Sequence, residues 1–211
     1  MIKCNVNLCA KIFVSAQEKT ANDGSKYLAF AVTLPLKGKD DSVAELHINV
    51  TTSGTIADAG NYISGRRVTV VGTMYVKKIE DKVFYHLRAA APIVFNQESD
   101  VDALTGSVEF SGKIGPKGVQ DLKGKTGKDF QVFDAFDHDK EGEKQGFNWV
   151  HFINFKPIHE DFFKAGTYVD VNGELGLEVF KSEAKISCRA NTIKQHEFTQ
   201  SPQQPASQQA Q

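Results

Sequence analysis

Aromatic and basic residues alternate with apolar residues in several short runs of this sequence. Val150 and Phe152 occupy alternate positions of one run, so Trp149 and His151 are expected on the opposite face of a strand. A solvent-side tryptophan is unusual unless it has something to pack on. A nucleic-acid base can fill that role, because stacking contributes about 1–3 kcal/mol per base whatever its identity. We interpret Trp149 as a base-stacking candidate, with packing under a loop or at a subunit contact as the alternative.

The same alternation selects the other binding candidates. Apolar residues at alternate positions leave Tyr27 outward beside Lys26, and Phe84 and Arg88 share the outward face of a later strand. The remaining candidates are cations and aromatics on predicted strands or on a predicted hairpin: Tyr75, Lys77, Lys78, Lys82, Phe130, Lys185 and Arg189. A single lysine is more often solvated surface than a phosphate ligand, so the prediction is a basic stripe rather than a set of independent contacts.

The chain contains an internal repeat at an offset of about 101 residues. Segment 65–72, GRRVTVVG, recurs as 166–173, GTYVDVNG, and segment 9–12 matches 111–114. A further match aligns the two histidines of LHIN and VHFIN. That alignment pairs His47 with His151 and places Glu45 where the second half has Trp149. The repeat indicates two domains with one common fold.

Each half is predicted to be a succession of short strands separated by glycine-rich and charged clusters. One short helical segment per half, at 55–63 and at 159–164, precedes the glycine-bounded strand. Five strands with a helix between the third and the fourth is the layout of an OB-fold barrel. The prediction is therefore an all-β chain of two tandem OB-fold five-stranded barrels, each with a short helix.

The domain boundaries follow from the composition along the chain. The first barrel is predicted over 1–97, a polar linker over 98–105 and the second barrel over 106–198. The last segment, 199–211, consists of Thr, Gln, Ser, Pro and Ala. Such a segment cannot bury enough apolar surface to offset its ordering entropy, so we expect it to be a disordered tail.

Three segments of the second half resemble a known family. The run NWVHFINFK at 148–156 is similar to the Trp-bearing third strand of bacterial single-stranded DNA-binding proteins. Segments 111–115 and 163–175 resemble the first strand and the glycine-bounded fourth strand of that family. The resemblance implies sequence-tolerant binding of single-stranded DNA in replication, recombination or repair, without catalysis.

The chain departs from the family pattern in two ways. Its tail lacks the acidic, aromatic-tipped peptide by which the family recruits enzymes, and it carries two barrels instead of one. It therefore resembles the two-barrel proteins of some bacteria, or a phage or plasmid version. Because single-barrel relatives form tetramers, the resemblance also implies a homodimer, with a monomer as the rival.

The sequence leaves two alternative functions open. OB barrels also serve as protein–protein interaction modules in phage or secretion assemblies, since a fold does not determine a function. A nuclease would need the acidic run Asp134, Asp137, His138, Asp139, Glu141 and Glu143 as a metal site. That run lacks calcium-loop spacing and is interpreted as a solvated hairpin tip. We therefore predict no enzyme activity, no cofactor and no metal.

Composition limits the remaining possibilities. The 211 residues carry a net charge of −1, so binding would depend on local basic stripes rather than on a bulk field. Three sparse cysteines suit reduced thiols, and no apolar run is long enough for a membrane helix. The expected location is the cytoplasm, at the nucleoid or in a phage-infected cell. The expected partners are single-stranded DNA, with RNA left open, and replication or recombination proteins, but no membrane.

Overall fold

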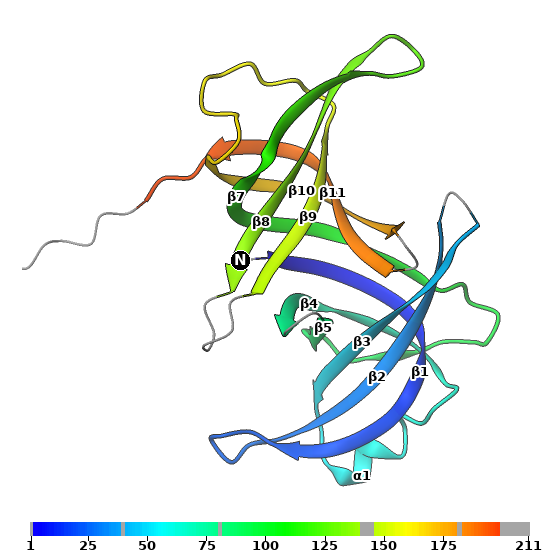
Figure 1. Ribbon diagram of the computed structural model, residues 1–211. Coiled ribbons are helices and arrows are strands. Elements are labelled where there is room, and N and C mark those ends of the chain that lie inside the picture. The colour runs from blue at the N-terminus through cyan, green and yellow to red at the C-terminus, as the bar shows by residue number, and fades with distance from the viewer. Residues whose placement is uncertain (1, 39–40, 80–81, 140–145, 181–182, 199–211) are drawn as a thin grey trace, which may run out of the picture.

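The computed structural model describes residues 2–38, 41–79, 82–139, 146–180 and 183–198, most of which are in strands (Figure 1). The first half contains β1 (Ile2–Thr20), β2 (Lys26–Lys37), β3 (Val43–Ser53), α1 (Ile56–Ala59), β4 (Arg67–Ile79), β5 (Lys82–Ala89) and β6 (Val94–Phe95). The second half contains β7 (Ala103–Lys123), β8 (Asp129–Asp139), β9 (Gly146–Asn154), β10 (Tyr168–Phe180) and β11 (Glu183–Gln195). The predicted disordered tail, 199–211, lies outside the described residues.

Each half closes into a five-stranded barrel of the same topology. In the first, β1 pairs with β2, β2 with β3, β3 with β5 in parallel, β5 with β4, and β4 again with β1. In the second, β7, β8, β9, β11 and β10 pair in the same order and β10 returns to β7. This closed order, with α1 between β3 and β4 of the first barrel, is the OB-fold layout. The predicted all-β chain of two tandem OB folds is confirmed.

The second barrel differs from the prediction because its described residues contain no helix between β9 and β10. Residues 159–164 form a turn instead, in which the Phe163 N–H donates to the Glu160 carbonyl at 3.0 Å. Phe163 is buried and packs edge-on against Phe133, with ring centroids 5.1 Å apart. A six-residue segment forms too few helical hydrogen bonds to be stable by itself, so the packing of Phe163 determines its conformation.

The two barrels share a ladder in which β1 pairs antiparallel with β7, from Ile2 opposite Phe110 to Cys9 opposite Ala103 (Figure 1). The ladder is symmetric, because Asn5 lies opposite Ser107, its own counterpart in the repeat. The barrels are therefore related by a local two-fold axis at this pair. β7 begins at Ala103, so the last residues of the predicted linker 98–105 belong to a strand.

The strand registers show that the motif alignment of the repeat is wrong between β3 and β9. The Ile12 N–H donates to the Arg66 carbonyl at 2.8 Å and the Ile114 N–H to the Thr167 carbonyl at 2.9 Å, so Ile12 and Ile114 are equivalent. From these positions, the β1–β2 and β7–β8 pairings make Thr33 equivalent to Phe136.

Thr33 lies opposite His47, and Phe136 lies opposite Trp149. His47 is therefore the counterpart of Trp149, whereas the motif alignment assigned it to His151. Glu45 likewise corresponds to Phe147. The error is two residues, and because side chains alternate with period two it leaves every predicted face unchanged.

Most of the predicted inward faces are buried, but Val83, which alternation placed on the inward face of β5, is exposed. Leu46, Ile48, Val150 and Phe152 are at most 1% exposed, and one apolar cluster runs through both barrels. The thiols of Cys4 and Cys188 lie in this core, and burial raises the pKa of each to about 12. Among the described residues, no helix has the length and apolar character needed to cross a membrane.

Candidate nucleic-acid interface

A groove crosses the joint between the barrels. Its central part is lined by Val83 and Tyr85 of β5 and by Ala184 of β11, and the same residues line the adjoining hollow on the first barrel. Trp149 and Lys185 line both the central part and a third hollow on the second barrel. The three hollows therefore form one groove. The Tyr85 hydroxyl donates to the Ala184 carbonyl at 3.2 Å and holds the two barrels together along it.

An exposed aromatic cluster lies at the part of the groove on the second barrel. Trp149 of β9 is 48% exposed, and its ring centroid lies 4.8 Å from that of Phe136. Phe147 packs on Phe136 from the same strand as Trp149, at 5.3 Å. A Cβ atom at Gly115 of β7 would lie only 2.8 Å from Cζ3 of Trp149. The glycine thus makes room for the indole ring to lie across β7.

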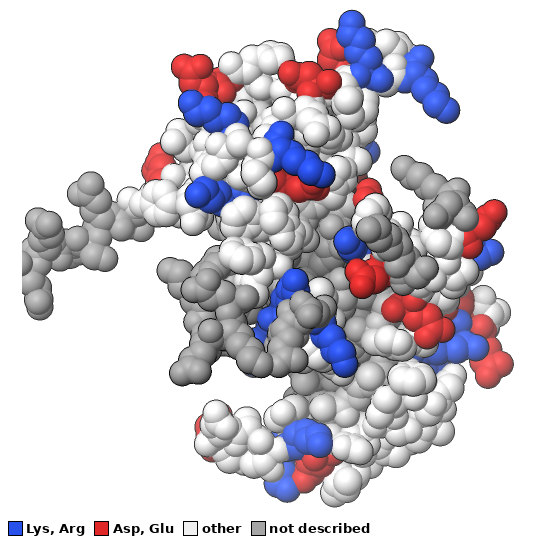
Figure 2. Space-filling model, in the orientation of Figure 1, with Lys and Arg blue, Asp and Glu red and all other residues white. Residues whose placement is uncertain are grey.

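The charges in the groove are mixed. Its cations are Lys78, Lys82, Lys117 and Lys185, and its acids are Glu45, Asp134, Glu178 and Glu183. Figure 2 likewise shows basic and acidic groups interspersed over the face in view. The ammonium of Lys185 lies 4.6 Å from the centroid of the Phe180 ring, a cation–π contact. Lysines in the groove can contact phosphates individually, while the groove as a whole provides little long-range attraction.

His151 is half-buried in the groove, and its Nδ1 lies 2.8 Å from the Asp134 carboxylate. Asp134 lies in the middle of β8, so the predicted hairpin-tip position of the acidic run is wrong for its first members. Glu141 and Glu143 lie outside the described residues. Within the described part of the chain, no group of three or more His, Cys, Asp or Glu residues could hold a metal ion.

A second aromatic pair lies at the far end of the same sheet face. Phe130 of β8 packs on Phe155, the residue after the end of β9, with ring centroids 5.8 Å apart. The Arg189 guanidinium lies 5.1 Å from the Phe155 ring and 3.6 Å from the Glu174 carboxylate. The structure thus places the predicted residues Phe130 and Arg189 on the face that carries Trp149.

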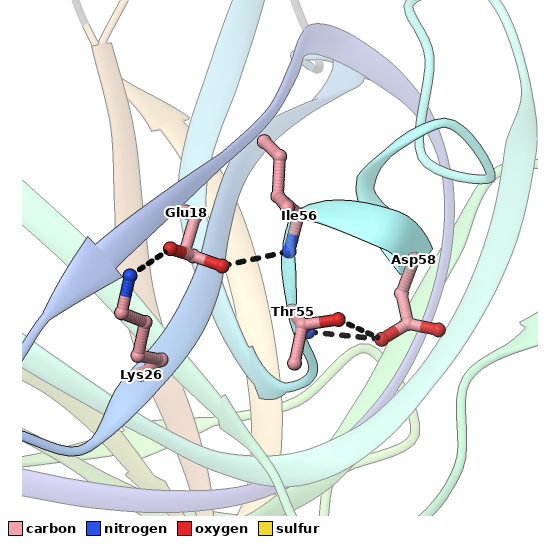
Figure 3. Close-up of polar contacts among 5 residues, drawn as sticks. All are labelled: Glu18, Lys26, Thr55, Ile56 and Asp58. Carbon is pink, nitrogen blue, oxygen red and sulfur yellow. Dashed lines mark hydrogen bonds and ion pairs between the residues drawn. The ribbon is translucent and has the colours of Figure 1, made fainter.

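Lys26 and Tyr27 lie away from the groove, at the start of β2 beside α1. The Lys26 ammonium pairs with the Glu18 carboxylate, which also accepts a hydrogen bond from the Ile56 N–H at 2.7 Å (Figure 3). The hydrogen bond from Lys26 lowers the pKa of Glu18 below its usual value. Lys26 thus has a structural partner, and Tyr27 corresponds by register to Phe130 of the second barrel.

The predicted hairpin residues are divided between two faces of β4. Lys78 lines the groove, and the alternation of side chains directs Tyr75 and Lys77 to the opposite face. From β5, Phe84 and Lys82 line the groove. Arg88 is exposed further along β5 and is absent from the groove lining.

The sequence analysis missed several residues of the groove and of the face that carries Trp149, among them Phe147, Phe155, Phe180 and Lys117. Phe147 and Phe155 lie at the same parity as Trp149 along the chain, so alternation alone could have identified them. No comparable signal pointed to Phe180 or Lys117. Their proximity to Trp149 depends on the pairing of distant strands.

No family model matches this chain, and no curated protein matches it. Among solved structures, it is similar to the wild-type single-stranded DNA-binding protein from Thermus aquaticus, with 12% identity over 95% of each chain and a TM-score of 0.49. A deletion mutant of that protein covers 97% of this chain and 98% of its own, at 12% identity and a TM-score of 0.47. The dimeric structure of the N-terminal domain of PriB protein from Thermoanaerobacter tencongensis matches 44% of this chain and 98% of its own, with 20% identity and a TM-score of 0.30. The strand pairings by themselves define the two OB folds.

Proposed function

We propose that this chain binds single-stranded DNA with little sequence preference and catalyses no reaction. Bases would stack on the aromatic rings, and groove lysines would contact the phosphates. The proposal extends to a role in replication, recombination or repair in the cytoplasm, with replication or recombination proteins as partners and RNA as a further ligand.

One observation carries the proposal: the half-exposed ring of Trp149 lies in a lysine-containing groove that runs across both barrels. An aromatic platform beside cations is the arrangement by which OB folds hold single strands. A duplex would bury its bases inside its own stack, so stacking on these rings selects single strands.

The direct test is the fluorescence anisotropy of a labelled oligo-dT titrated with the full chain, with the same oligonucleotide as a duplex for comparison. We expect saturable binding of the single strand and much weaker binding of the duplex. Absence of binding at low salt would refute the proposal. It would favour the alternative of a protein–protein module, for which the exposed Val94, Phe95 and Phe198 offer apolar contacts.

Salt should weaken binding through the groove lysines. Each phosphate contact on a single strand lowers the logarithm of the binding constant by about 0.7 per tenfold rise in salt. The variant Lys78→Ala/Lys82→Ala/Lys185→Ala should therefore show a slope shallower by about 2. Lys26→Ala is the matched control because Lys26 pairs with Glu18 away from the groove. Equal slopes for the triple variant and the control would contradict the assignment of the groove.

The homodimer is also a proposal. Val94, Phe95 and Phe198 are exposed and would be covered by such a contact, whereas Ile93 is buried in its own barrel. A two-fold contact is the commonest way to cover such residues. Light scattering at micromolar concentration should give a mass near twice 23.2 kDa, and a particle of 23.2 kDa would exclude the dimer.

A further inference from the structure

We infer that Phe13 is the base-stacking residue of the first barrel and acts together with His47. This inference rests on the proposed function and assigns a second anchor point to the same bound strand. Phe13 is 57% exposed on β1, and its ring centroid lies 5.3 Å from that of His47. No sequence motif marks this residue.

The register equivalences place the pair where the second barrel has Trp149. Ile12 is equivalent to Ile114, so Phe13 corresponds to Gly115, and His47 corresponds to Trp149. In the second barrel the large ring comes from β9 and lies over a glycine of β7. In the first barrel the large ring comes from β1 and lies beside the smaller imidazole of β3. Each barrel thus presents an exposed aromatic ring at the equivalent position. In the first barrel the ring comes from β1, and in the second it comes from β9.

Local backbone geometry supports this position for the Phe13 side chain. The pairing of β1 with β2 shifts register between Ile12 and Val14, and the equivalent pairing of β7 with β8 shifts after Ile114. A bulge of this kind bends a strand and redirects the side chain within it. A ring held more than half exposed has an open face on which a base can stack.

The groove connects Trp149 with His47, the residue beside which Phe13 lies. His47 lines its hollow on the first barrel, and Trp149 lines the central part and the hollow on the second. Lys82 lines the same hollow as His47, Lys78 lines the central part, and Lys185 lines the central part and the hollow on the second barrel. A single strand in the groove would therefore stack on Trp149 at one end and on Phe13 at the other, with lysines beside its phosphates.

Binding of labelled oligo-dT by Phe13→Ala tests the inference, with Val14→Ala as the control. Val14 is the neighbouring exposed apolar residue of β1 and has no ring. Loss of one stacked base should weaken binding about 5- to 150-fold in Phe13→Ala. Val14→Ala should bind as the wild type does. Phe13→Trp, which keeps an aromatic face, should retain affinity, whereas Phe13→Leu, which keeps only apolar bulk, should not.

The outcomes separate this inference from the proposed function. If the wild type binds oligo-dT and Phe13→Ala binds equally well, the Phe13 assignment is wrong and the proposed function stands. A loss in Phe13→Leu no greater than in Val14→Ala would also overturn it, since bulk alone would then suffice. If the wild type does not bind, both fail. When Phe13→Ala is saturated with oligo-dT, its Trp149 emission should still change as in the wild type. Trp149, the stacking residue of the second barrel, is intact in this variant.

Discussion

Replacing Asp102 with alanine should lower the free energy of unfolding by about 3 kcal/mol. The Asp102 carboxylate pairs with the guanidinium of Arg67, whose side chain is only 6% exposed. The Nε of Arg67 has no hydrogen-bond partner among the described residues, so removal of Asp102 leaves a buried charge poorly compensated. Removing one partner of a buried pair costs about 3–5 kcal/mol, and the 21% exposure of Asp102 favours the lower end of that range.

Urea unfolding followed by circular dichroism measures this effect, and Glu109→Ala is its control. Glu109 pairs with Lys3 at 3.5 Å across the joint between the barrels, but both side chains are more than one-third exposed. Exposed pairs contribute at most about 1 kcal/mol. Similar unfolding midpoints for the two variants would show that the pair of Asp102, in the segment before β7, with Arg67 of β4 contributes no more stability than an exposed pair.

Gly173→Ala should be similarly destabilising, by about 3 kcal/mol. Gly173 lies at a register shift of the β10–β11 ladder, where an added Cβ would collide with the backbone carbonyl of Arg189. The same Cβ would lie 2.6 Å from the Cys188 sulfur. Overpacking costs typically about 1–3 kcal/mol, and a backbone obstacle cannot move aside as a flexible side chain can. Its repeat counterpart, Gly72, faces the carbonyl of Arg88 in the same way.

Gly60→Ala provides the comparison for this variant. Gly60 has a φ of −60°, which alanine adopts readily, and nothing lies within 4 Å of its added Cβ. The change should be neutral or stabilising by up to about 1 kcal/mol. If Gly173→Ala unfolds at the same urea concentration as Gly60→Ala, close approach of the strands is not what requires glycine at 173.

The sequence predicted those features that depend on local alternation. Val150 and Phe152 are buried while Trp149 is exposed, because side-chain direction in a strand follows from parity alone. The OB topology was also predictable, since the repeat and the α1 segment mark the order of elements within each half. The cysteines follow the same pattern, with Cys4 and Cys188 buried on strands.

Features that depend on pairing between distant strands were not predictable. The motif similarity between His47 and His151 is real in sequence, but the ladders make Trp149 the counterpart of His47. Only that register shows that His47, which lies beside Phe13, occupies the position of Trp149. The helix predicted at 159–164 was wrong for a related reason. The burial of Phe163 against distant strands overrides a weak local preference for helix.

The structural role of Lys26 was likewise not predictable from local sequence. Its partner Glu18 lies on the neighbouring strand and also binds the first turn of α1, which the sequence does not disclose. The separation of Tyr75 from Lys78 has a simpler cause. The two are an odd number of residues apart on one strand, so they must face opposite sides.

The emission of Trp149 on titration with poly-dT tests the central claim most directly. Trp149 is the only tryptophan of the chain, so its fluorescence reports on the groove alone. Bases stacked on its ring should quench the emission strongly, in parallel with the rise in anisotropy of the labelled strand. Unchanged emission at a concentration where anisotropy shows saturated binding would contradict stacking on Trp149 and the placement of the DNA in the groove.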